Sequence, residues 1–170
     1  MVRVKNVLDT WKAIRQDSAT AVEEFPAADL DFRPVPEMQS FREIARHILD
    51  ASDGLIGVLA DGETDFSNPA FRPRMKNYLR DLPADASGAN LAAALRQSMD
   101  AIAAKLEAKP AEFFATTMKR IDGQEITRLE MVQFVKEHEL THRQQLFVYL
   151  RLKGLTPATT RRRLARQAAK

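Results

Sequence analysis

Hydrophobic residues recur every three or four positions in four long stretches of the chain, which is the spacing of one face of an α-helix. These stretches predict helices over residues 4–25, 40–61, 88–108 and 127–152. Polar residues fill the opposite face of each stretch, as expected for helices that pack around a shared core. The pattern therefore predicts an all-α fold, with Trp11 as a core residue on the apolar face of the first helix.

Residues that satisfy free backbone groups mark the ends of two of these helices. Ser40 followed by Glu43, and Thr127 followed by Glu130, each form a capping-box pattern at a helix start. Gly154 suits the position after the last helix, because glycine readily adopts the left-handed conformation that ends many helices.

Two segments break the helical pattern. Three prolines interrupt residues 62–86, where we expect a long crossover with a short helix over residues 75–82. A connection longer than the usual roughly two to eight residues allows the second and third long helices to run parallel. Asp122 and Gly123 lie between two short extended runs, which predicts a small β-hairpin or an irregular segment before the last helix.

The composition indicates one domain, because 170 residues of which 45% are hydrophobic can bury a substantial core. The chain contains no cysteine, which excludes disulfides, thiolate metal ligands and a cysteine nucleophile. Residues 1–6 lack the apolar segment of a signal peptide, and no run approaches the roughly 18 apolar residues of a membrane span. We therefore expect a cytoplasmic protein without a membrane partner.

The net charge of +3 is concentrated in the C-terminal segment. Residues 155–170 hold five basic residues and no acidic one, so the remainder has 21 basic residues against 23 acidic ones. We predict a helical domain over residues 1–157 and a solvated basic tail over residues 158–170. The alternative is a tail that contacts nucleic acid or an acidic surface. No helix-turn-helix spacing or interleaving of aromatic and basic residues is present, so we do not expect a nucleic-acid partner.

The chain has only three histidines, and all of them lie in predicted helices: His47, His138 and His142. His138 and His142 are four residues apart, so they lie one turn apart on one helix face, among apolar residues. Two adjacent buried imidazoles are costly unless their ring nitrogens find partners. We therefore predict that the three histidines hold a divalent metal, although a pair at this spacing alone is more often structural or exposed.

Glu139 directly follows the first histidine of this pair. The resulting His-Glu-x-x-His spacing is that of the zinc-protease motif, but a match this short is weak evidence by itself, so we do not expect a metalloprotease. Glu139, Glu43 and Asp50 are candidates for proton transfer beside the metal. We select Glu43 and Asp50 as the catalytic candidates because they share approximately the helix side of His47. The simpler interpretation of each is a solvated carboxylate on a helix surface.

Two segments together resemble the DinB/YfiT-like family of metal-binding proteins. Ser40-Phe-Arg-Glu-Ile-Ala-Arg-His47 resembles the second-helix signature of that family, and His138-x-x-x-His142-Arg-x-Gln145-Leu146 with Tyr149 and Gly154 resembles its fourth-helix signature. The resemblance covers residues 1 to about 157. It implies a four-helix bundle with up-down-down-up topology, three-histidine metal ligation and a homodimer. Gln145 and Tyr149 are candidates to line the site, and core packing suits Tyr149 equally well.

Three imidazole ligands leave at least one coordination position open, as in catalytic metal sites. Zinc or nickel is expected, and iron or manganese also fits, since ligand type alone does not separate these metals. The resemblance implies a thiol S-transferase that uses a low-molecular-weight thiol cosubstrate such as bacillithiol, mycothiol or glutathione. Hydrolysis of a small-molecule substrate by an activated water is the variant without a thiol. The alternative function is a non-catalytic metal-dependent binding or stress-response protein.

Overall fold

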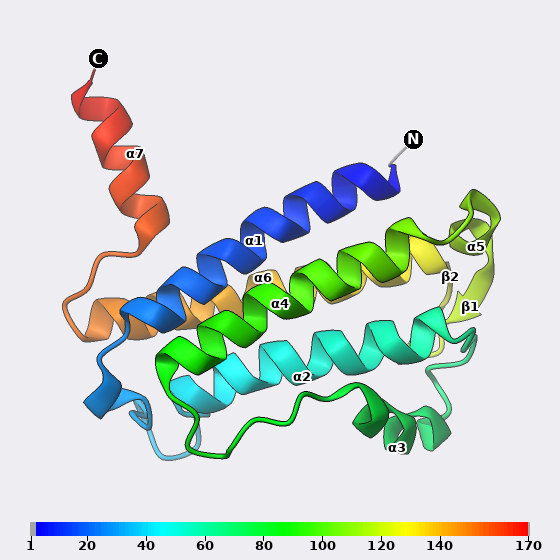
Figure 1. Cartoon of the computed structure of the whole chain (residues 1–170), viewed down its shortest axis with the longest axis horizontal. Coiled ribbons are helices and arrows are strands. Elements are labelled where there is room, and N and C mark those ends of the chain that lie inside the picture. The colour runs from blue at the N-terminus through cyan, green and yellow to red at the C-terminus, as the bar shows by residue number, and fades with distance from the viewer. Residues whose placement is uncertain (1–2, 170) are drawn as a thin grey trace.

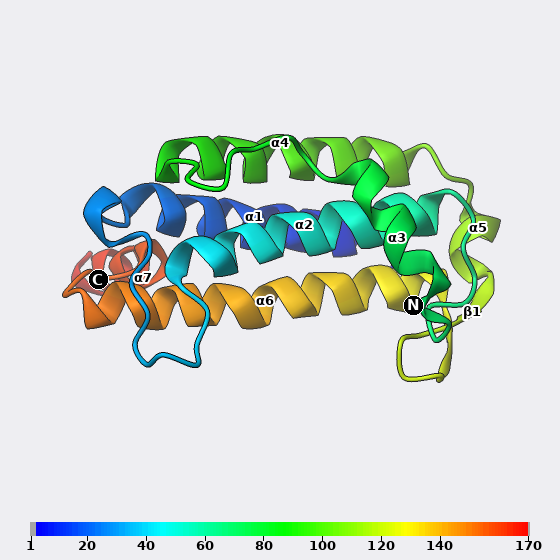
Figure 2. The same ribbon diagram turned by 90° about the horizontal axis from the view of Figure 1, so that it is seen from below.

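Four long helices lie side by side in the computed structural model, which describes residues 3–169 (Figures 1 and 2). They are α1 (Val4–Glu24), α2 (Phe41–Ala60), α4 (Gly88–Glu107) and α6 (Arg128–Leu152). Helix α1 contacts α4 and α6, and α2 contacts the same two helices. The four helices therefore form a closed ring around the core, and the predicted helical class is confirmed.

Both predicted capping boxes form at the starts of the helices that carry the histidines. The Ser40 hydroxyl accepts a hydrogen bond from the Glu43 backbone N–H at 3.2 Å, and the Glu43 carboxylate accepts one from the Ser40 N–H at 2.8 Å. Thr127 and Glu130 make the equivalent pair of bonds at the start of α6. These bonds set the residues at which α2 and α6 begin, and with them the helix face on which each histidine lies.

Short elements connect the long helices. They are the 3₁₀ turns Ala27–Asp29, Pro69–Phe71 and Lys76–Tyr78, α3 (Arg72–Met75), α5 (Ala111–Ala115), β1 (Thr117–Lys119) and β2 (Glu125–Thr127). The predicted hairpin is present, since β1 pairs antiparallel with β2 and places Met118 opposite Ile126. Gly123 in its turn has a φ of 83°, a conformation that glycine adopts without strain.

The short helix predicted over residues 75–82 was misplaced. Helix α3 begins at Arg72, and the 3₁₀ turn that follows it ends at Tyr78. Asn68 accepts a hydrogen bond from the Ala70 N–H and so caps the preceding turn. Pro73 lies at the start of α3, where its missing N–H needs no partner. Prolines that break the helical pattern in the sequence therefore lie at the starts of short helical segments, Pro69 in the 3₁₀ turn and Pro73 in α3.

The basic segment expected as a solvated tail forms helix α7 (Ala158–Ala168), which extends away from the four long helices in Figure 1. Arg161 pairs with Glu24, and Arg162 pairs with Asp17 at 2.6 Å, so α7 is attached to α1 through ion pairs. None of its residues is buried. The predicted helical domain begins at residue 1, and the predicted tail ends at residue 170. Residues 1–2 and 170 lie outside the described residues.

The core consists of two apolar clusters. One contains Phe41 and Tyr149, and in it the rings of Phe25 and Phe41 stack at 3.7 Å. The other contains Trp11, which is fully buried, so its predicted place in the core is confirmed. No helix within residues 3–169 has the length and apolarity needed to cross a membrane.

Candidate metal centre

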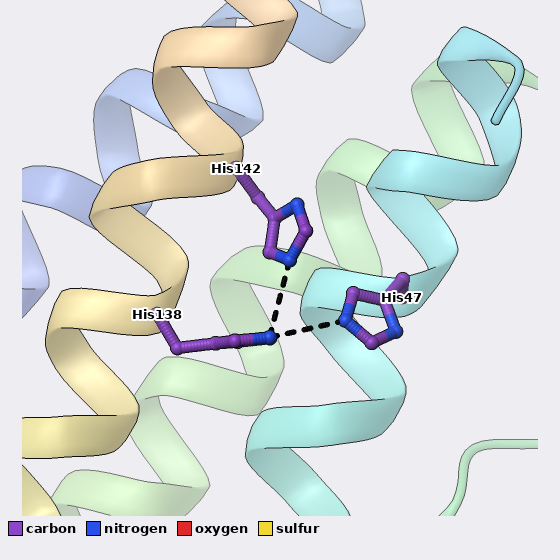
Figure 3. Close-up of side chains that lie close together, drawn as sticks. All are labelled: His47, His138 and His142. Carbon is purple, nitrogen blue, oxygen red and sulfur yellow. Dashed lines mark hydrogen bonds between the residues drawn. The ribbon is translucent and has the colours of Figure 1, made fainter. Parts of the chain in front are cut away.

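Helices α2 and α6 bring the three histidines together, with their ring nitrogens directed at one another (Figure 3). The Nε2 atom of His138 lies 3.1 Å from the Nε2 atom of His47 and 3.1 Å from that of His142. All three side chains are partly buried, and each offers a ligand nitrogen within 4.8 Å of the other two. The three histidines therefore lie close together, as predicted.

The donor set fits a divalent ion. Zinc–nitrogen bonds of about 2.0–2.1 Å at a tetrahedral angle place two ligand nitrogens about 3.3 Å apart, close to the separation of the Nε2 atoms. A single hydrogen bond cannot account for the arrangement of the three rings. The Nε2 atom of His138 carries at most one hydrogen, and it faces the Nε2 atoms of both His47 and His142. The three rings could therefore hold a metal ion through their Nε2 atoms.

Burial keeps two of the imidazoles neutral. Burial and, to a smaller extent, the neighbouring His142 and His47 together lower the pKa of His138 to about 4. Burial also lowers the pKa of His47, although the nearby Asp50 carboxylate opposes this effect. Because metal ligation requires the neutral ring, both side chains are in the ligand form at neutral pH.

A cavity of about 710 Å³ opens beside His47. Its walls are the first half of α2 and residues 82–86 of the crossover that precedes α4. Five charged side chains line it: Asp31, Arg42, Glu43, Arg46 and Asp50. A small polar molecule in this cavity would lie against His47.

The two catalytic candidates, Glu43 and Asp50, both line this cavity but differ in their surroundings. Glu43 accepts hydrogen bonds from Arg33 at 2.6 Å and from the Ser40 N–H, and these bonds lower the pKa of its carboxyl. Asp50 is half-buried, and burial raises the pKa of its carboxyl although Arg46 lies 3.1 Å away. Asp50 is therefore the better suited of the two to accept and release a proton.

Glu139 does not have the role expected for it beside the metal. Its side chain is only 2% exposed. Its carboxylate accepts hydrogen bonds from Trp11 at 2.5 Å, from Arg15 at 2.8 and 2.9 Å, and from Ser18 at 3.2 Å. All of these donors belong to α1, so Glu139 links α6 to α1 instead of serving the histidines.

The sequence interpretation missed this buried polar network. Arg15 also donates to Ser52 of α2 and to Ser98 of α4, so one guanidinium joins all four long helices. The signal was present, because Arg15 and Ser18 follow Trp11 at helical spacing on the inward face of α1. Polar residues at core positions indicate either a buried network or a site.

The two further candidates near the site also separate. Gln145 contacts the histidines, since its side-chain oxygen lies 2.6 Å from the Nδ1 atom of His142. Tyr149 is fully buried in the core and donates its hydroxyl to the Gln39 carbonyl at 2.5 Å. Gln145 therefore belongs to the histidine group, and Tyr149 belongs to the core.

Comparisons with known proteins agree with these features. The sequence profile of the DinB superfamily matches residues 10–146. A DinB-like protein from Bacillus subtilis has a similar structure, with a TM-score of 0.70 over 89% of this chain and 94% of that chain, at 19% identity. A DinB-like protein from Bacillus cereus gives a TM-score of 0.69 over 91% and 95%, at 17% identity. At these identities the likeness shows the fold alone, and no curated protein matches this chain.

Proposed function

Because this chain belongs to the DinB superfamily, we propose that it binds one divalent metal ion through His47, His138 and His142. This proposal is supported by the convergence of the three Nε2 atoms from α2 and α6. Three imidazole ligands suit zinc or nickel, and they also accept iron or manganese.

The proposed activity is metal-dependent chemistry on a small molecule in the cavity beside His47. A divalent ion with an open coordination position supplies Lewis acidity that favours ionisation of a thiol or of water. In a thiol transfer, the sulfur bonds to an electrophilic carbon while the bond from that carbon to its leaving group breaks. Asp50 accepts the thiol proton and passes it to the leaving group, and Arg46 holds the Asp50 carboxylate in place. Since the chain has no cysteine, the thiol is an external cosubstrate.

The test compares carboxylate variants of the metal-loaded protein. Bacillithiol, mycothiol and glutathione are each incubated with an electrophile, and thiol consumption is measured. Asp50→Asn is expected to lower the rate about 10²- to 10⁴-fold, as loss of a general base does, while the bound metal is retained. Glu137→Gln, a change at an exposed position of α6, is the control. An Asp50→Asn variant with the full rate would remove Asp50 from the mechanism.

A second candidate function is metal-dependent binding without turnover. It is favoured by the ion pairs in the cavity, because Arg46 holds Asp50 and Arg33 holds Glu43, which leaves neither carboxylate free. Stoichiometric metal with no turnover of any thiol or hydrolysable substrate would select this function.

We also propose a homodimer. Val148 and Leu152 lie one turn apart on α6 and are 51% and 57% exposed, so they form an apolar surface that a second copy of the chain can cover. Light scattering should show a dimer for the native chain and a monomer for the Val148→Glu, Leu152→Glu double variant. Leu164→Glu changes a comparably exposed leucine on α7 and should leave the dimer intact.

We propose that the four long helices follow the up-down-down-up order, and the course of the colour along α1, α2, α4 and α6 in Figure 1 supports it. A cytoplasmic location is proposed from the absence of cysteine, which fits a reducing compartment.

A further inference from the structure

Within the part of the chain that the structure describes, only one of the three histidines has a hydrogen-bond partner for its second ring nitrogen. The Nδ1 atom of His142 lies 2.6 Å from the Oε1 atom of Gln145, three residues later on α6. Among residues 3–169, no hydrogen-bond partner lies at the Nδ1 atom of His47 or of His138. His142 is therefore the ring whose orientation the protein itself fixes.

The contact with Gln145 selects one form of the His142 ring. A neutral imidazole carries its hydrogen on one nitrogen and a lone pair on the other. The Gln145 oxygen only accepts hydrogen bonds, so Nδ1 carries the hydrogen and Nε2 carries the lone pair. That Nε2 atom is the one directed at His138 (Figure 3).

The opposite ring form would be unfit for a metal site. If Nε2 of His142 carried the hydrogen, its N–H group would point into the space between the three rings, and His142 would offer no lone pair to a metal there. A residue that excludes this form removes an unproductive state before any metal arrives.

We propose that Gln145 is a positioning residue that holds His142 in the Nδ1–H form, with its Nε2 lone pair aimed at the metal position. This inference rests on the proposed three-histidine site, but it concerns a property that the metal-free protein already has. It assigns Gln145 a role that packing alone does not require, since the side chain is only partly buried.

The first measurement reads the ring form directly. In the metal-free protein at about pH 8, where histidines are neutral, nitrogen NMR distinguishes a ring nitrogen with hydrogen from one without. Three histidines give three pairs of ring signals, and the His142→Ala variant identifies the pair of interest. We expect His142 to carry its hydrogen on Nδ1 in the native chain and to populate both forms in Gln145→Leu. A native His142 with its hydrogen on Nε2 would overturn the proposal.

The second measurement reads the consequence for metal binding. Zinc titrated against a competing chelator should bind Gln145→Leu about 10- to 100-fold more weakly than the native chain, the usual effect of losing a hydrogen bond to a ligating histidine. Gln145→Glu keeps the acceptor and should restore the affinity. Gln144→Leu, at the exposed neighbouring position, is the control and should leave the affinity unchanged.

The two measurements separate this inference from the proposed function. If the native chain binds no zinc, the metal site fails, and the ring form of His142 still decides whether Gln145 positions it. If zinc binds and Gln145→Leu binds it as tightly as the native chain, the metal site stands and the positioning role is refuted.

Discussion

The buried carboxylate of Glu139 accepts hydrogen bonds from Arg15, Trp11 and Ser18 at once, so it ties α6 to α1. Its neighbour His138 faces the other two histidines, so consecutive residues of α6 serve the core and the site. The geometry of the site is therefore coupled to the buried network through a single peptide bond.

Glu139→Gln is expected to lower the free energy of unfolding by about 3–5 kcal/mol, because it leaves the buried Arg15 guanidinium without its counter-charge. Urea unfolding measures this value. Glu137→Gln changes an exposed carboxylate two residues earlier and should shift stability by less than about 0.5 kcal/mol. Equal stabilities of the two variants would show that the ion pair is not essential.

The lowered pKa of His138 predicts a pH effect on the metal-free protein. The pKa of this histidine is near the usual value of 6.5 in the unfolded chain and near 4 in the folded protein. Between these values the unfolded state binds more protons, so the stability from this group is complete above about pH 6.5 and is lost as the pH falls towards 4. Chelator-treated native protein should lose more stability over this range than His138→Gln. Parallel pH profiles for the two proteins would contradict the pKa assignment.

The three histidines were predictable because they are rare in the chain and two of them share a helix face. Arg15 was not linked to Glu139, although it lies at a core position, because they are far apart in sequence and helical periodicity gives no pairing between helices. The contact between Gln145 and His142 was also missed, because it depends on a side-chain rotamer that spacing does not determine.

Among the elements, the crossover segment between α2 and α4 packs closely against α2. A Cβ atom on Gly57 would overlap the ring of Tyr78, which follows α3. Arg80 pairs with Asp53 of α2 at 2.9 Å, and Arg46 donates to the Leu82 carbonyl at 2.9 Å. These contacts hold the crossover segment that forms one wall of the cavity.

Gly57→Ala is expected to destabilise the protein by about 1–3 kcal/mol, since the aromatic ring of Tyr78 cannot bend away from the added methyl group. Chemical unfolding gives the value. In a Tyr78→Ala background the same change should cost much less, because the ring is gone. A cost that is the same in both backgrounds would show that the ring is not what excludes the side chain.

The elements with strong local signals were predicted, and those that depend on distant contacts were not. Helices α2 and α6 carry both an apolar face and a capping box, so their starts were evident. The position of α3 and of the turn after it depends on the close approach of Met75 to Gly54 and of Tyr78 to Gly57 on α2, which no local pattern reveals. Helix α7 has no buried residue, and its ion pairs with Glu24 and Asp17 of α1 could not be read from its sequence.

At the scale of the whole molecule, α7 is attached to the four long helices and adds nothing to their core. Deleting residues 158–170 is expected to change the urea midpoint less than Glu139→Gln does, because no residue of α7 is buried and Asp17 keeps its contact with Arg143. Zinc affinity should remain unchanged. A truncated chain that unfolds or loses zinc binding would show that the helical domain does not end near residue 157.

The proposed metal site consists of one divalent ion held by three histidines from two helices. Elemental mass spectrometry on tag-free protein, purified without chelator, tests it most directly when the native chain is compared with His142→Ala. We predict close to one zinc or nickel ion per native chain and a loss of that ion in the variant. Native protein that holds no metal after reconstitution with zinc, nickel, iron and manganese, or a variant that keeps a full equivalent, would contradict the proposed site.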